Sequence, residues 1–207
     1  MFHKDSLAMK TMTWLADMLH IQMLWLAGSL SGLIVLGFFP ASFAMFSVMR
    51  EMIFKTRSFS FNKKFIKEYK DNFLKSNLYG FSLLAVIALL VVYFRTTLNV
   101  DHNLSVLFLF LGYGMIVLFS IALLYFPTVY AHYQLNIFQL IRHSVVIMVA
   151  CPVNTLGMVG ALLGLYLMHS ELPILTPFVS IAMFAYGLSY SAHNAFTKLT
   201  RKMLQTT

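Results

Sequence analysis

The chain has 207 residues, of which 59% are hydrophobic and only 11% are charged, and its mean hydropathy is +0.77. Soluble domains carry about a quarter charged residues, so this composition excludes an ordinary soluble protein and predicts an integral membrane protein. The formal net charge of +8 is concentrated in one loop, as expected of a cytoplasmic membrane loop, and does not indicate nucleic-acid binding.

A membrane-spanning helix needs about 20 predominantly apolar residues. Five stretches meet this requirement, at residues 20–39, 78–95, 104–126, 145–168 and 174–196. The sequence therefore predicts an all-α fold, a polytopic membrane helix bundle with five transmembrane helices in a single membrane domain, 1–207. Cytoplasmic interfacial helices are expected in the amphipathic segment 40–77.

The basic residues predict the orientation, because cytoplasmic loops are enriched in Lys and Arg. With five spans, Lys4, Lys10 and Arg95 fall on the side of the N-terminus, and the other twelve basic residues fall on the opposite side. This distribution predicts an outside N-terminus and a cytoplasmic C-terminus. No acidic residue lies in a span, and His20 and His193, near span ends, are interpreted as interfacial histidines; an ion-coupled carrier usually keeps ionisable groups at membrane depth.

The first apolar stretch is too long for one straight span, and Pro40 stands near its middle. Proline disrupts a helix interior but suits the first turn of a new helix. Pro40 is therefore predicted to mark a corner at the cytoplasmic face, where a second helix begins. Arg50 and Asn77 are expected to hydrogen-bond the backbone groups freed at this corner, since such groups need partners at membrane depth.

A similar segment recurs 87 residues later. Residues 39–46 read F-P-A-S-F-A-M-F and residues 126–133 read F-P-T-V-Y-A-H-Y, so Pro127 is predicted to form a second corner. The recurrence indicates either a parallel duplication or the independent use of the same interfacial Phe-Pro corner.

The segment 58–77 is predicted to form a basic amphipathic helix. Aromatic residues recur every four positions on one side, at Phe61, Phe65, Tyr69 and Phe73, and lysines lie off this stripe. Such a helix either lies in the headgroup layer of anionic lipids or docks another membrane component. Together with Arg50, these aromatic residues are the candidates for partner docking.

Small residues in two spans predict close helix packing. The candidate packing positions are Gly28, Gly32, Gly157, Gly160 and Gly164. Packing inside the bundle is the favoured interpretation, and an interface with another chain is the alternative.

Catalytic, metal-binding and cofactor-binding motifs are absent from the sequence, and no enzymatic activity, metal or cofactor is expected. Asp101, His102 and Glu171 lie in predicted outside loops. A membrane enzyme acting on lipid-linked sugars through these three residues is the weakest of three functional hypotheses.

The stretch L-x-G-L-I-V-L-G-F-F-P-A-S-F-A-M-F-S-V-M-R followed by F-I-K-E-Y-K-D-N-F-L-K-S-N-L-Y-G resembles the YesL family of bacterial membrane proteins, most specifically over residues 24–80. The matching positions are Gly37, Pro40, Ala41, Ala44, Phe46, Val48, Arg50, Phe65, Tyr69, Lys70, Phe73, Ser76, Asn77, Leu78 and Gly80. The resemblance implies five spans, a place in the bacterial cytoplasmic membrane and genes adjacent to sugar-uptake ABC transporters.

From this resemblance, the expected function is that of a non-enzymatic accessory subunit of a carbohydrate ABC importer. Its partners would be membrane lipids and the permease or ATPase subunits. The alternative is an independent small transporter or channel, for which the spans offer few polar residues, namely Ser82, Thr96, Asn154, Thr155 and Ser189.

Overall fold

The computed structural model describes residues 7–54, 59–97, 102–133, 135–171, 174 and 176–205, and every regular element in these ranges is a helix. In chain order the elements are α1 (Leu7–Ser31), α2 (Val35–Phe54), α3 (Phe61–Asp71), α4 (Phe73–Thr97), α5 (His102–Tyr133), α6 (Ile137–Ala150), α7 (Pro152–Glu171), the π-helix η1 (Thr176–Ser180) and α8 (Ile181–Gln205). The predicted all-α class is confirmed.

Helix α2 lies at the centre of the molecule and packs against α1, α3, α4, α5 and α8. Its middle is buried on several sides, with Ala41, Val48 and Met49 fully inaccessible to solvent. Helix α8 also buries small residues, among them Ala182, Ala185, Ala192 and Ala195. Small side chains let helix backbones approach closely, so these alanines contribute packing that the predicted glycine positions did not include.

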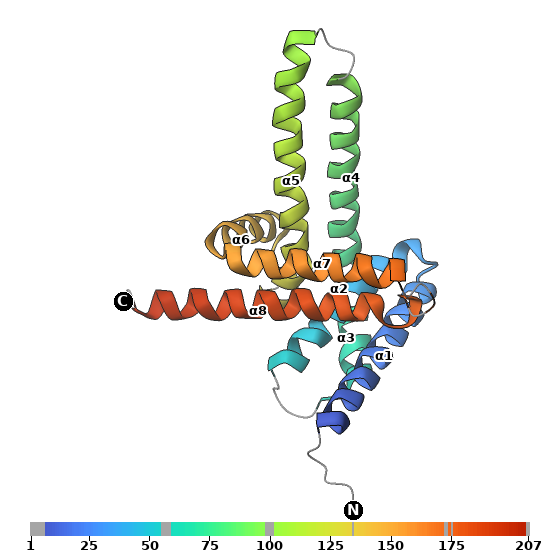
Figure 1. Cartoon of the computed structure of the whole chain (residues 1–207). Helices are drawn as coiled ribbons and strands as arrows, with labels where there is room; N and C mark the ends of the chain where they lie inside the picture. The colour runs from blue at the N-terminus through green and yellow to red at the C-terminus, as the bar shows by residue number, and fades with distance from the viewer. Residues whose placement is uncertain are drawn as a thin grey trace, which may run out of the picture.

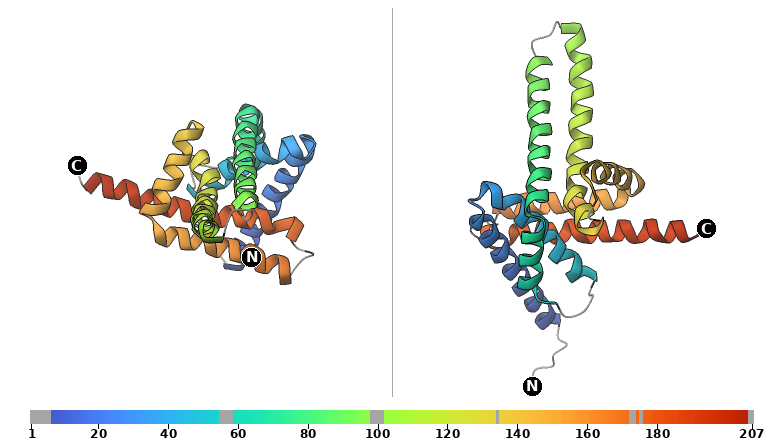
Figure 2. Two further views of the ribbon diagram at one scale, coloured as in Figure 1. Left: turned by 90° about the horizontal axis from the view of Figure 1, so that it is seen from above. Right: turned by 180° about the vertical axis from the view of Figure 1, so that it is seen from behind.

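Among the described residues, three helices are long and apolar enough to cross a membrane. They are Phe73–Thr97, Leu107–Tyr133 and Pro152–Glu171. Helices α4 and α5 run side by side as a projecting hairpin, whereas α7 lies beside α8 and crosswise to that hairpin (Figures 1 and 2). The structure therefore supports a helical membrane protein with three candidate spans, and five spans are not confirmed.

The predicted corner at Pro40 is wrong. Helix α1 ends at Ser31, and Pro40 lies inside α2 rather than at its start. The chain turns instead at residues 32–34, where Leu33 and Ile34 have φ angles of 57° and 65°. Positive φ is costly for residues with a side chain, and especially for a β-branched one. Both side chains are exposed, and the turn is closed by the backbone, with the Ile34 N–H donating to the Ser29 carbonyl at 2.9 Å.

Pro127 also lies inside a helix, and the second predicted corner is therefore wrong as well. The two Phe-Pro segments instead pack face to face in the core. The Phe43 ring lies 4.5 Å from the Tyr130 ring and 6.1 Å from the Phe126 ring, measured between centroids. Proline removes one backbone hydrogen bond and clashes with the preceding turn, at a cost of about 3 kcal/mol in a helix interior. The sequence analysis missed that burial of these aromatic residues offsets this cost.

The stretch expected as a span at 145–168 is interrupted at Cys151, which lies between α6 and α7. Pro152 is the first residue of α7, where its missing N–H costs nothing. The stretch expected at 174–196 begins with η1, and Gln22 of α1 holds this irregular segment. Its side chain donates to the Pro177 carbonyl at 3.0 Å and accepts from the Ala182 N–H at 2.9 Å.

Candidate functional site

The aromatic side of α3 packs against α1 of the same chain. Phe65 is 3% exposed, and an added Cβ at Gly28 would lie 3.1 Å from the Phe65 ring. The Tyr69 hydroxyl donates to the Gly28 carbonyl at 3.0 Å and lies 3.2 Å from the Ser31 hydroxyl. The four-residue aromatic spacing thus does form one face, and that face is covered from within the chain.

The two ends of the aromatic stripe are also engaged internally. The Phe61 ring lies 5.8 Å from the His20 ring, and Phe73, the first residue of α4, lies 5.6 Å from Tyr69. Phe65 is therefore buried against α1, whereas Phe61, Tyr69 and Phe73 are half-buried, and their role in partner docking stays a prediction.

The opposite side of α3 carries the charge. Lys64 forms ion pairs with Glu51 of α2 at 2.5 Å and with Glu68 at 3.2 Å. Burial alone would lower the pKa of Lys64, but the hydrogen bonds and charges of the two carboxylates outweigh it and raise that pKa. This pairing joins α3 to α2. It also leaves Lys63, Lys67 and Lys70 as an exposed row, which we call the lysine face.

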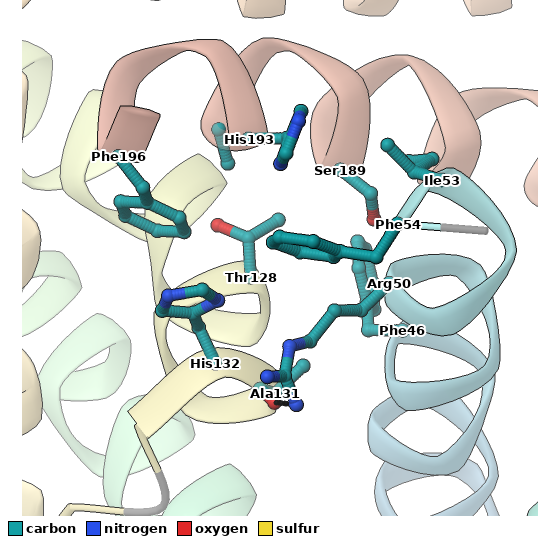
Figure 3. A pocket seen from close by; sticks show the side chains of 11 residues that line it. Phe46, Arg50, Ile53, Phe54, Thr128, Ala131, His132, Ser189, His193 and Phe196 are labelled. Carbon is teal, nitrogen blue, oxygen red and sulfur yellow. Dashed lines mark hydrogen bonds between the residues drawn. The ribbon is translucent and has the colours of Figure 1, made fainter. Parts of the chain in front are cut away.

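A second polar cluster lies where α2, α5 and α8 meet (Figure 3). Arg50 reaches from α2 to α5, donates to the Ala131 carbonyl at 3.2 Å and lies 5.5 Å from the centre of the Phe54 ring. Ala131 is in the last turn of α5, where carbonyls have no partner within the helix and a basic side chain binds favourably. Arg50, predicted as a docking residue, therefore caps a helix end, although not at the predicted corner.

Two histidines complete this cluster, which we call the Arg–His pocket. The His193 ring lies 4.4 Å from Phe54 in an edge-on arrangement, and the His132 ring stacks on Phe196 at 4.6 Å. Phe54 contacts both imidazoles and lies between them (Figure 3). The sequence analysis placed His193 at the membrane interface and His132 in the segment that follows the predicted Pro127 corner. An ionisable residue inside an apolar helix was the signal for His132.

The remaining predicted corner residue, Asn77, lies within α4 and donates to its own helix at the Phe73 carbonyl, 3.0 Å away. This hydrogen bond does not involve the carbonyl that Pro40 leaves without a helical donor. Asn77 and Arg50 thus donate to backbone carbonyls at other helix positions than the predicted corner.

The predicted packing glycines divide into two groups. An added Cβ would meet Phe65 at Gly28, backbone atoms of Gly37 at Gly32, and the Ser191 side chain at Gly157. Gly160 and Gly164 have nothing within 4 Å of such a Cβ. The prediction of internal packing does not hold for these last two, because no atom of the described residues packs against them.

The residues expected in a membrane enzyme or a channel do not assemble into a site. Helix α5 begins at the far end of the hairpin, whereas Glu171 ends α7 at its base (Figure 1), and Asp101 lies outside the described residues. Of the channel candidates, Ser82 bonds to its own helix and Asn154 donates to the Ser191 carbonyl at 2.9 Å. Within the described ranges no group of three or more His, Cys, Asp or Glu residues could hold a metal ion.

The fold and site thus define a helical membrane protein with an internally docked amphipathic helix and a buried Arg–His pocket. The chain belongs to the family described as "Protein of unknown function, DUF624", whose pattern it matches over residues 18–94. The predicted YesL-family resemblance is confirmed. The matched region runs from α1 to the end of α4 and includes the docked α3.

Three relatives come from Bacillus subtilis (strain 168), and all three are called uncharacterized proteins. YteU is 30% identical over 176 residues, which cover 84% of this chain and 78% of the relative. YesV is 30% identical over 180 residues, covering 84% of each chain, and YesL is 27% identical over 152 residues, covering 73% and 71%. No solved structure matches the chain.

Proposed function

We propose that the protein is a non-enzymatic accessory membrane subunit of a bacterial carbohydrate ABC importer, bound to the permease or ATPase subunits through the lysine face of α3. The choice of a carbohydrate ABC importer as the partner rests on the resemblance to the YesL family. The docking role rests on one observation: the aromatic side of α3 is used against α1, and its charged side is left uncovered at Lys63, Lys67 and Lys70.

The position of α3 supports this role. Helix α3 ends at Asp71, and α4, a candidate span, begins at Phe73. The lysine face therefore lies next to one end of a candidate spanning helix, and in the orientation proposed below this is the cytoplasmic end. The ion pairs of Lys64 with Glu51 and Glu68 hold α3 against α2, so the face is presented on a fixed element.

Reversing the charge of this face is expected to break the assembly. The variant Lys63→Glu/Lys67→Glu/Lys70→Glu replaces three attractive contacts by repulsive ones, and recovery of permease peptides in a mild-detergent pull-down from native cells should fall at least about tenfold. Quantitative mass spectrometry of the eluates measures this. Absence of importer subunits from the wild-type eluate would refute the proposed partner.

The matched control carries the same change of net charge at exposed residues on other helices, Lys10→Glu/Arg142→Glu/Lys198→Glu. It should recover permease peptides at the wild-type level. Equal losses in both variants would show that net charge, and not the lysine face, controls the association.

We further propose five spans with the N-terminus outside and the C-terminus in the cytoplasm, on the strength of the Lys and Arg distribution. In a Cys151→Ser background, an impermeant maleimide applied to intact cells should label Ser170→Cys at the end of α7. The same reagent should label Asp71→Cys on α3 only after permeabilisation; both positions are exposed. Labelling of both only after permeabilisation would mean that α7 does not cross, as its crosswise position beside α8 (Figure 2) allows.

A further inference from the structure

The Arg–His pocket collects polar atoms that have no partner. Among the described residues, eight buried side-chain nitrogen or oxygen atoms lack a hydrogen bond, and four of these belong to pocket residues: Arg50 Nε, His132 Nδ1, His193 Nδ1 and Ser189 Oγ. Buried polar groups are almost always paired, and leaving one unpaired costs about 1–3 kcal/mol. Four such atoms around one cavity therefore indicate an occupant with which they bond.

The charge of the pocket indicates that the occupant is an anion. The Arg50 guanidinium is always protonated, and the residues that line the pocket include two histidines and no Asp or Glu. The Ala131 carbonyl and the Phe54 ring give the guanidinium only partial compensation. Arg50 as a whole is half-buried, but its Nε atom is buried and unpaired. A desolvated cationic donor pairs best with a negative charge, so a small anion beside Arg50 would stabilise the junction of α2, α5 and α8.

The size of the pocket limits this anion. The cavity measures about 10 Å³, which is close to the volume that a single water-sized particle occupies. Three aromatic side chains, Phe46, Phe54 and Phe196, line it. A sugar or a phosphate group exceeds this space, whereas a halide ion is close to it.

We propose that the Arg–His pocket is a binding site for one chloride-sized monovalent anion. Arg50 donates through Nε, and His132, which lies beside the guanidinium group (Figure 3), donates through Nδ1–H. Either nitrogen of a neutral imidazole can carry the proton, so this needs no change of charge on His132. Ser189 donates its hydroxyl proton from α8. The anion thereby links three helices that are distant in sequence.

Thermal unfolding of the purified full-length protein in mild detergent tests this site, with chloride replacing gluconate at constant ionic strength. A ligand that binds only the folded state raises the unfolding midpoint as its concentration passes the dissociation constant. The wild type should show a saturable rise of several degrees with chloride and a smaller rise with the larger iodide. A midpoint independent of chloride would overturn the proposal and leave water as the occupant.

Two variants assign the effect to the pocket. Arg50→Gln removes the charge, and His132→Phe keeps the aromatic stacking on Phe196 while removing both ring nitrogens; each should lower the chloride affinity at least about tenfold. The control Arg142→Gln, at an exposed position of α6, should keep the full response. Persistence of the response in Arg50→Gln or His132→Phe would place the anion elsewhere.

Chloride-35 NMR of the wild type keeps the proposal testable if a variant does not fold. Exchange of chloride between solution and a protein site broadens its resonance, and bromide should reverse the broadening by competition. Absence of broadening would overturn the proposal whatever the variants do.

Discussion

Replacement of Gly37 by alanine is expected to destabilise the protein by about 3 kcal/mol, the upper end of the usual cost of overpacking, because the obstructing atoms cannot move aside. A Cβ at Gly37 would collide with the Ser29 carbonyl oxygen and lie 2.7 Å from the Gly28 carbonyl oxygen. Both obstacles are backbone atoms of α1 and cannot rotate away as a side chain would. Relief requires α1 and α2 to separate, which would also disturb the turn at residues 32–34.

The measurement is thermal or denaturant unfolding in mild detergent, and Gly160→Ala is its control. Position 160 is in α7 and has nothing within 4 Å of an added Cβ. Alanine there should leave stability unchanged or raise it by up to about 1 kcal/mol, since glycine is the poorer helix former. Similar behaviour of the two variants would mean that the close approach of α1 and α2 does not contribute to stability.

Gln22→Leu is the second change with a large expected effect. Gln22 is fully buried, and its amide satisfies two backbone groups at the junction of η1 and α8, the Pro177 carbonyl and the Ala182 N–H. Leucine has a similar volume but leaves both groups unpaired in an apolar environment, each at about 1–3 kcal/mol. We expect a loss of about 3 kcal/mol in the free energy of unfolding.

The control for this variant is Gln139→Leu on α6, where the side chain is exposed. Its effect should stay within about 0.5 kcal/mol, as for most surface substitutions. If Gln22→Leu is as stable as the wild type, the contact between α1 and the start of α8 is held by packing alone, and the two hydrogen bonds only orient it.

The aromatic stripe shows how far local pattern reaches. The four-residue spacing of Phe61, Phe65 and Tyr69 predicted correctly that these rings share one helix face. The same spacing contained nothing about α1, which covers Phe65, and an external partner for this helix stays a prediction. Gly28, read as part of a packing motif, is the residue on which Phe65 rests.

The prolines show why helix ends were misplaced. Pro40 and Pro127 each carry a local cost that favours a helix start, and prediction from the sequence weighs only that cost. In the folded chain the two segments face each other through Phe43, Phe126 and Tyr130, and this burial keeps both helices continuous. The actual turn lies between Gly32 and Gly37, two glycines that the close approach of α1 and α2 requires.

The sequence by itself determined the class of protein, the all-helical fold and the face of α3 on which the aromatic rings lie, because composition and helical periodicity are properties of neighbouring residues. Only the tertiary structure decided the Arg–His pocket. Arg50, His132 and His193 belong to three helices separated by long stretches of chain, and no pattern within one segment brings them together. Periodicity fixes which side chains share a helix face, but the packing of whole helices fixes which faces meet.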